Sequence, residues 1–359
     1  EGFLAAWLMN GTTLDAAGFL SPSNVGDNSY RIVGSGDFNA DGQEDLVFQH
    51  TDGTIAVWYM SGTTQVGADL VNPSNPGDIN WRIVATADLN KDGKSDLVFQ
   101  HTDGTLAVWY MNGITLSSAA LFNPSNPGDK NWRVVGTGDL NSDGKADLIF
   151  QHTDGTLATW YLDGIKLSQA TLLNPSNPGD VKWRVVATAQ VSAQLATSLS
   201  GAAERPTAVS TTATGSGKLT LLGNKLSYAI TYSGLSGSAI AAHIHGSATT
   251  EQAAGVIIPF SNVTGASGTL TGTLDITADQ ASMIRDGLTY VNIHTAANPG
   301  GEIRGQITKD ASLAGKVDLI FQHADGTLAI WILDGAKLSS AQLLSPSNSG
   351  ATWKVVAPK

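Results

Sequence analysis

The 359-residue sequence contains no cysteine, which excludes a disulfide framework and any thiolate metal site. Only 14% of the residues are charged, and acidic side chains outnumber basic ones, which gives a net charge of −11. This balance argues against nucleic acid and anionic membranes as partners. No apolar run approaches the roughly 18 residues that mark a membrane span. What the chain has in abundance is Gly, with 40 residues, which favours short strands joined by tight turns.

A unit of 51 residues recurs along the chain. Each copy holds four strand-like runs, separated by D-x-N-x-D-G, T-D-G-T, N-G and P-S-N-P-G-D loops, and Asp-Gly and Asn-Gly are strong hairpin signals. Four antiparallel strands at such a period are typical of a β-propeller blade. In the second copy the expected strands are 81–87, 96–101, 106–111 and 115–123. A tryptophan recurs every 51 residues at Trp7, Trp58, Trp109 and Trp160, and we expect Trp58, Trp109, Trp160 and Trp331 to pack between blades.

We therefore expect an all-β fold, a β-propeller of about five blades with an inserted β-sandwich. Four blades are complete. The fifth is closed by both chain ends, with third and fourth strands at residues 2–10 and 12–20 and a first strand at 352–357. Its second strand, the D-L-V-F-Q-H element, is absent. Since Glu1 lies within a motif, we read the chain as a mature form or a fragment. Either residues before Glu1 or a partner supplies the strand, and self-association into a fibre through this blade is one alternative.

The fourth copy breaks off at residue 190 and resumes at 315, so we assign residues 1–190 and 315–359 to the propeller and 191–314 to an inserted domain. The insertion has no Trp and is rich in small residues. Its alternating runs indicate a sandwich, and residues 278–286 indicate a short helix with Thr277 as N-cap. The expected strands are 217–221, 225–232, 239–245, 255–259, 268–274, 290–294 and 302–308.

Three loops repeat the pattern D-x-N-x-D-G-x-x-D. Alternate oxygen-bearing side chains around a glycine turn converge on a hard cation, and Ca²⁺ prefers six to eight oxygens. The seventh position offers its backbone carbonyl and the last Asp both carboxylate oxygens. We expect about three structural Ca²⁺ ions, with solvated Asx-rich turns as the alternative. The predicted calcium residues are Asp37, Asn39, Asp41, Gln43 and Asp45 in the first loop, Asp88, Asn90, Asp92, Lys94 and Asp96 in the second, and Asp139, Asn141, Asp143, Lys145 and Asp147 in the third.

The full repeat, D-x-N-x-D-G-x-x-D-L-x-F-Q-H-T-D-G-T-x-A-x-W-Y-M-x-G, resembles the FG-GAP/VCBS repeats of integrin-like propellers. The resemblance covers both propeller segments. It implies a secreted or cell-surface protein, calcium in the first hairpin loop of each blade, and adhesion to an extracellular glycan or protein. It does not imply catalysis. The fourth calcium loop, interrupted by the insertion, and the incomplete fifth blade depart from the family pattern and leave the closure of the ring open.

Three histidines fall in the inserted domain. His243 and His245 are two residues apart on an expected strand, so both point to the same face. His294 ends another strand, and three imidazoles on adjacent strands would suit Cu or Zn. Glu302 and Arg304 follow on the next strand, where they could support the imidazoles. The alternative is that the histidines pair with Glu302 or with the backbone inside the sandwich.

The segments A-H-I-H-G, G-V-I-I-P-F and Y-V-N-I-H-T-A-A-N-P-G-G-E-I-R-G-Q-I resemble the CHRD domain, named from chordin, over residues 193–307. The resemblance implies a secreted protein, often a bacterial one. The H-x-H strand is also similar, more weakly, to the copper ligands of copper/zinc superoxide dismutase, with Arg304 in the role of an arginine beside the copper. Copper binding or dismutase-like activity is therefore the alternative to a non-enzymatic binding function.

Four further histidines each end the second strand of a blade, before a T-D-G-T or A-D-G-T hairpin. We expect them on the same face as the P-S-N-P-G-D loops. Together with neighbouring Asp and aromatic residues they would form repeated sugar sites, or they would cap the hairpins structurally. They are His50, His101, His152 and His323.

Overall fold

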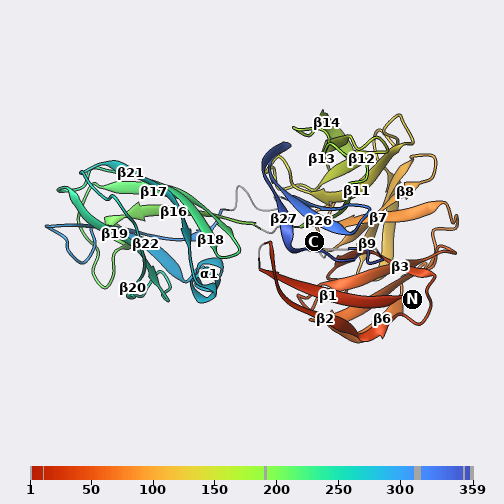
Figure 1. Ribbon diagram of the computed structural model, residues 1–359, viewed down its shortest axis with the longest axis horizontal. Helices are drawn as coiled ribbons and strands as arrows, with labels where there is room; N and C mark the ends of the chain where they lie inside the picture. Colours follow the sequence, from red (N-terminus) through yellow and green to blue (C-terminus); the bar gives the residue numbers. More distant parts are fainter. Residues whose placement is uncertain (1, 11, 190–191, 311–316, 351, 356–359) are drawn as a thin grey trace. The chain divides into compact units, whose positions relative to one another are not determined.

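The computed structural model describes residues 2–10, 12–189, 192–310, 317–350 and 352–355 (Figure 1). The chain separates into two compact units, residues 1–190 with 315–359 and residues 191–314. Nearly all regular structure in the described residues is β-strand, as predicted, with one α-helix and one 3-10 turn. No helix among these residues is both long and apolar enough to cross a membrane.

The propeller unit contains four blades of four strands and a terminal blade built from the N-terminal hairpin. Within each blade consecutive strands pair antiparallel. The terminal blade has β1 (Phe3–Asn10) and β2 (Thr13–Asn24). Blade I has β3 (Tyr30–Gly36), β4 (Asp45–His50), β5 (Ile55–Ser61) and β6 (Thr64–Leu70), and blade II has β7 (Trp81–Ala87), β8 (Asp96–His101), β9 (Leu106–Asn112) and β10 (Thr115–Leu121). Blade III has β11 (Trp132–Gly138), β12 (Asp147–His152), β13 (Leu157–Asp163) and β14 (Lys166–Leu172), and blade IV has β15 (Arg184–Ala189), β25 (Asp318–Gln322), β26 (Thr327–Asp334) and β27 (Lys337–Asn348).

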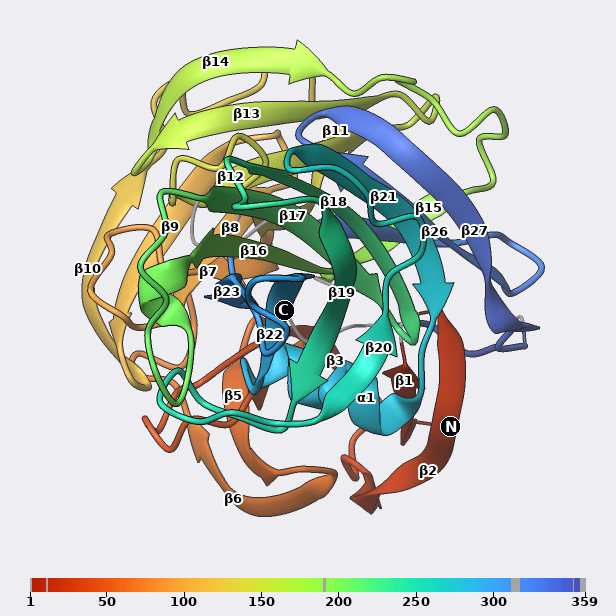
Figure 2. The same ribbon diagram turned by 90° about the vertical axis from the view of Figure 1, so that its left-hand side faces the viewer.

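The ring of blades is closed, which the sequence left open. The outer strand of each blade, or the second residue after it, donates a backbone hydrogen bond to the hairpin of the next blade, and the terminal blade takes part on both sides. Figure 2 shows the outer strands β6, β10, β14, β27 and β2 around the ring. The five bonds run from Ser21 N to Thr63 O (3.0 Å), Asn72 N to Ile114 O (2.8 Å), Asn123 N to Ile165 O (2.9 Å), Asn174 N to Ala336 O (2.8 Å) and Ser345 N to Thr12 O (2.8 Å).

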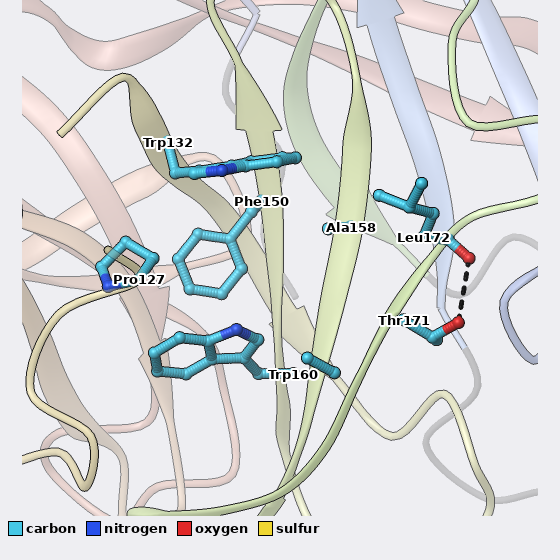
Figure 3. A pocket seen from close by; sticks show the side chains of 8 residues that line it. Pro127, Trp132, Phe150, Ala158, Trp160, Thr171 and Leu172 are labelled. Carbon is cyan, nitrogen blue, oxygen red and sulfur yellow. Dashed lines mark hydrogen bonds between the residues drawn. The ribbon is translucent and has the colours of Figure 1, made fainter. Parts of the chain in front are cut away.

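Apolar clusters between neighbouring blades form the core of this unit. Trp160 of blade III, only 7% exposed, packs in one cluster with Val98 and Val108 of blade II. Trp331 of blade IV likewise shares a cluster with Ile149 of blade III. Trp109, Trp160 (Figure 3) and Trp331 therefore pack between blades, as expected.

A glutamine of each second strand clamps the first strand of the following blade. In blade III the Gln151 side chain donates to Trp183 O at 3.0 Å and accepts from Val185 N at 3.0 Å. Gln322 makes the same contacts to Trp353 O (2.7 Å) and Val355 N (3.4 Å). Residues 352–355 are not a strand, unlike the prediction, and 356–357 lie outside the described residues. The C-terminal segment nevertheless makes the same two hydrogen bonds with a glutamine side chain that the first strand makes in other blades.

The inserted unit is one continuous sheet that curls around its own core, so the two layers of the expected sandwich are halves of the same sheet. Its strand order is β20-β19-β22-β23-β16-β17-β18-β21, with β24 also paired to β16. The sequence missed β16 and predicted the other long strands. The elements are β16 (Ser192–Ser200), η1 (Gly201–Ala203), β17 (Thr214–Leu222), β18 (Lys225–Ser233), β19 (Ala239–Gly246), β20 (Val256–Pro259), β21 (Gly268–Asp275), α1 (Ala278–Arg285), β22 (Thr289–Thr295), β23 (Ile303–Gln306) and β24 (Thr308–Lys309).

Helix α1 begins as predicted at the N-cap Thr277. The Thr277 hydroxyl accepts from Gln280 N, and the Gln280 side chain accepts from Thr277 N, which makes a capping box.

Candidate metal centre

The pairing of β19 with β22 places the three predicted histidines on one face of the sheet. Ile244 and Val291 are opposite each other and fully buried in the core. Because strand side chains alternate between faces, the residues beside them project from the other face. There His243 and His245 of β19 lie next to His294 of β22.

The three imidazoles are close enough to share one ion. His243 Nδ1 lies 3.2 Å from His294 Nε2. The ring centroids are 5.0 to 5.8 Å apart, and one nitrogen from each ring lies within 4.8 Å of the other two. Among the described residues, this is the one group of three or more His, Asp or Glu side chains that meets so closely.

Backbone carbonyls fix the tautomers of two of these histidines. His245 Nδ1 lies 2.9 Å from Ala254 O, and His294 Nδ1 lies 3.0 Å from Pro299 O. A carbonyl only accepts, so both Nδ1 atoms carry the proton and both Nε2 atoms keep a lone pair. His245 Nε2 is buried without a hydrogen-bond partner. Donation of the second ring nitrogen to a carbonyl is the usual support of a metal-binding histidine.

The electrostatics of the site keep the imidazoles neutral. Burial lowers the pKa of His243, His245 and His294, and for the last two it outweighs the carbonyl acceptors, which raise the pKa. His245 and His294 are 8% and 7% exposed, whereas His243 is half-buried. Neutral imidazole is the form that binds metal. Three such ligands with one partly exposed member suit Cu or Zn with a coordination position left open.

Arg304 lies in the layer behind the histidines. The His245 ring stacks on Tyr290 at 4.9 Å, and the Arg304 guanidinium sits 3.5 Å from the Tyr290 ring centroid. Arg304 is 2% exposed and donates to Thr249 O at 2.9 Å. It therefore holds Tyr290, and through it His245, in place. Tyr290 was not predicted, although its position four residues before His294 puts it on the same face.

Glu204 and Asn292 extend this polar face, and neither was predicted. Asn292 Nδ2 donates to Glu204 Oε2 at 3.3 Å. Burial raises the pKa of Glu204 to about 7 against the opposing charge of Arg304. Glu204 Oε1, Asn292 Oδ1 and Arg304 Nη1 are buried with no partner among the described residues. Side chains alternate along β22, so the sequence could have indicated that Asn292 shares a face with His294. No local pattern connects Glu204 to residue 292, which lies 88 residues later.

Glu302 does not reach the imidazoles through any hydrogen bond of the described residues. It is fully buried and accepts from Ser236 N, Ser236 Oγ, Thr295 Oγ1 and Thr211 Oγ1 at 2.6 to 2.9 Å. Burial alone would raise its pKa, but these donors outweigh it and lower the pKa to about 2. Glu302 therefore ties the loops at one end of the sheet together.

We expect Glu302→Gln to destabilise the inserted unit by about 1–3 kcal/mol at pH 7, because an amide offers one acceptor atom where the carboxylate offers two. The lowered pKa means that this stability is present above the unfolded-state pKa of about 4.3 and is lost as the pH falls toward 2. Chemical denaturation of both proteins at pH 7 and pH 3 measures this. If the difference in unfolding free energy between the two proteins does not shrink at pH 3, the result would contradict the role of the Glu302 charge.

The four propeller histidines each bridge two carboxylates of their own blade. His101 Nε2 lies 3.3 Å from Asp78 Oδ2, its Nδ1 lies 2.8 Å from Asp103 Oδ1, and its ring packs 5.0 Å from Trp81. The hydrogen bond with Asp103 is the main cause that raises the pKa of His101. His50, His152 and His323 bridge the equivalent carboxylates, and Tyr30 stands in place of the tryptophan beside His50. This geometry favours hairpin capping over sugar binding.

The predicted calcium loops are turns in which the side-chain oxygens face inward along the loop. In the first, Asp37 Oδ2 accepts from Gly42 N at 2.8 Å and Asp41 Oδ1 accepts from Gln43 N at 2.8 Å. Asp45 is fully buried and accepts from Phe38 N and Met60 N. The second and third loops repeat these bonds.

These loops have the donor chemistry for a hard cation. Each carboxylate oxygen that accepts one hydrogen bond keeps a further lone pair. The lysines at the seventh position point elsewhere, because Lys94 Nζ donates to Asn112 and Lys145 Nζ to Asp163, both at 2.8 Å. The loop oxygens are less tightly grouped than the histidine nitrogens, since no three carboxylates in the described residues come within 4.8 Å.

Comparison with known proteins gives two family matches. Residues 37–99 and 88–150 match the model of the FG-GAP-like repeat, and residues 195–307 match the CHRD domain. No curated protein matches the chain.

Similar solved structures include BBS1N in complex with ARL6DN, soaked with mercury (12% identity, 90% of this chain and 84% of that chain, TM-score 0.28). They also include the computationally designed Ika8 protein (13%, 88% and 87%, TM-score 0.22) and Chaetomium thermophilum Raptor (10%, 90% and 26%, TM-score 0.27).

Proposed function

Because this chain carries FG-GAP-like repeats and a CHRD domain, we propose that it is an extracellular binding protein with two kinds of metal site. The CHRD domain would hold one Cu or Zn ion, and calcium would stiffen the propeller. Its ligand would be an extracellular glycan or protein. The three imidazoles that meet within 4.8 Å are the observation on which the proposal depends.

His243, His245 and His294 would hold the transition metal. Three neutral imidazoles packed together without a metal are unfavourable, because a buried nitrogen lone pair that lacks a hydrogen-bond donor costs free energy. His245 Nε2 has this problem in the described residues, and a cation would relieve it. His243 and His245 come from one strand and His294 from the next, so the metal would also tie β19 to β22.

Superoxide turnover by a copper-loaded CHRD domain is a second candidate. One observation favours it: Arg304 lies on the face of the sheet that carries the histidines, and its Nη1 is buried with no partner among the described residues. When bound, copper would supply the electron transfer. Arg304 would supply positive charge for a small anion, and Tyr290 would hold the guanidinium in position.

Metal analysis of the purified chain tests the proposal. After loading with Cu²⁺ or Zn²⁺ and desalting, we expect about one equivalent per chain, with affinity at least 100-fold weaker in His294→Ala because one of three ligands is lost. His152→Ala in the propeller is the matched control and should keep the metal. A wild-type chain that retains no more metal than His294→Ala would contradict the proposal. Superoxide turnover lost with the metal would support the second candidate.

A further inference from the structure

Three neighbouring polar side chains of the inserted unit each bury one atom that has no hydrogen-bond partner. Glu204, Asn292 and Arg304 are 3%, 3% and 2% exposed. Asn292 lies opposite Arg304 in the pairing of β22 with β23, and its Nδ2 donates to Glu204 Oε2 at 3.3 Å. The atoms left without a partner among the described residues are Glu204 Oε1, Asn292 Oδ1 and Arg304 Nη1. Since each such atom costs free energy when it stays dry, three on adjoining side chains indicate one shared ligand.

The hydrogen-bonding roles of these atoms define the ligand. Asn292 Nδ2 donates both to Glu204 Oε2 and to Gly300 O, at 3.3 and 3.4 Å, which fixes the orientation of the amide and leaves Oδ1 as an acceptor. Arg304 Nη1 only donates, and an ionised Glu204 Oε1 only accepts. The ligand must therefore accept from the guanidinium and donate to two oxygens. An anion cannot donate, and the guanidinium repels a cation. A water molecule does both, and a buried water makes about three hydrogen bonds.

The same place is suited to hold a proton. Burial raises the pKa of Glu204 to about 7, although the charge of Arg304 and the hydrogen bond from Asn292 lower it. Water serves either form of the carboxyl group, because it donates to the carboxylate and accepts from the protonated Oε1. Both forms therefore keep three hydrogen bonds to one water.

The other charges nearby compensate each other. Arg205 and Glu251 come from the flanking loops and pair at 3.2 Å between Arg205 Nη2 and Glu251 Oε2. They act on the pKa of Arg304 in opposite directions, and Tyr290 and Glu204 raise that pKa. A new charge at this face would therefore change the charge of Glu204 more than these fixed groups do.

The candidate metal centre is the place where such a charge would enter. Asn292 lies opposite His243 in the pairing of β19 with β22, and opposite Arg304 on its other side. One residue therefore separates the histidines from the partner of Glu204. Inside a protein, charges are screened less than at its surface, and a nearby cation favours the ionised form of a carboxyl group.

We propose that Glu204, Asn292 and Arg304 form a buried site for one water molecule and one exchangeable proton, and that a cation at the three histidines expels this proton. The O–H bond of Glu204 breaks, its electron pair stays on the carboxylate, and the proton passes through the water to the buffer. The displacement rests on the proposed metal site, whereas the water and the proton do not. By linkage, protonation of Glu204 weakens metal binding by the same factor by which the metal weakens the bond to the proton.

Titration of the whole chain with Zn²⁺ by isothermal calorimetry, in buffers of different ionisation enthalpy, counts the protons released. At pH 7 the wild type should release about half a proton more than Glu204→Gln, and at pH 8 about a tenth more, because a group with a pKa of about 7 is half protonated at pH 7. Glu251→Gln is the matched control. It removes an exposed carboxylate of the neighbouring loop and should release as many protons as the wild type.

Zinc that binds with equal proton release in the wild type and in Glu204→Gln would overturn the displacement and leave the metal site intact. A chain that binds no zinc would contradict the proposed function as well. If Glu204→Gln does not fold, the wild type decides, since its proton count should fall from pH 7 to pH 8, whereas ionisation of a metal-bound water alone would make it rise.

A high-resolution crystal structure of the metal-free chain tests the water directly. We expect one ordered water within hydrogen-bond distance of Arg304 Nη1, Asn292 Oδ1 and Glu204 Oε1. A dry site, or an anion in this position, would overturn the assignment whatever the calorimetry shows.

Discussion

Removal of calcium should lower the melting temperature of the propeller by about 15 °C or more. Each ion held at 100 times its dissociation constant adds about 2.7 kcal/mol of stability, and roughly 2–4 °C follow from each kcal/mol in a unit of this size. Three loops at 37–45, 88–96 and 139–147 would contribute together. Without the ion, burial raises the pKa of Asp45, and repulsion from Asp41 and Asp37 raises it further.

Differential scanning calorimetry in EGTA and in calcium measures this effect. The control is a triple variant, Asp41→Asn, Asp92→Asn and Asp143→Asn, because an amide oxygen still accepts the loop N–H but carries no charge. It should melt at the same temperature in both buffers. A wild type indifferent to EGTA would show that the loops are only hydrogen-bonded turns.

The calcium-free protein should also lose stability as the pH rises from about 4 to 8. Burial raises the pKa of Asp96 and Asp147 to about 6, above the unfolded value of 3.8. Their protonated form is therefore favoured in the fold, and this contribution is lost through pH 6. The carboxylate partners raise the pKa of His101 and His152, whose contribution is present below the unfolded value of 6.5 and is lost above the raised pKa. Calcium binds the ionised carboxylates, so in its presence the stability of the protein should depend less on pH.

The sequence predicted most of the strands because turn chemistry and period two are local. The repeat fixed β7 (Trp81–Ala87) and β8 (Asp96–His101) to the residue. The strand β16 was missed, since its Ala, Ser and Thr residues give a weak apolar pattern. Closure of the ring was also not predictable, because it depends on backbone bonds of Ser21 and Ser345, which stand where the other blades have Asn.

The candidate metal centre was predictable in part for the same reason. His243 and His245 share a face because side chains alternate along a strand. His294 lies beside them because its strand, β22, pairs with β19. The groups that tune the site lie elsewhere. Ala254 O and Pro299 O come from loops, and Glu204 follows a 3-10 turn. Their positions result from tertiary packing, which no local pattern reports.

Asp147→Ala should destabilise the propeller by about 3–5 kcal/mol even in EGTA. Asp147 is fully buried and accepts from Leu140 N at 2.9 Å and Leu162 N at 3.0 Å. Each buried N–H left without a partner costs about 1–3 kcal/mol, and the lost side chain leaves a small cavity. The same anchor in Asp45 and Asp96 joins the loop to the third strand of each blade.

Denaturant titration in EGTA separates this role from metal binding. Asp147→Asn keeps one acceptor and should lose about half as much stability, whereas Asp143→Asn, at an exposed position, should change it by less than about 0.5 kcal/mol. A small effect of Asp147→Ala in EGTA together with a large one in calcium would assign the carboxylate to the ion alone. An equal loss in both buffers would mean that the buried anchor holds the blade and that calcium acts on the outer oxygens of the loop.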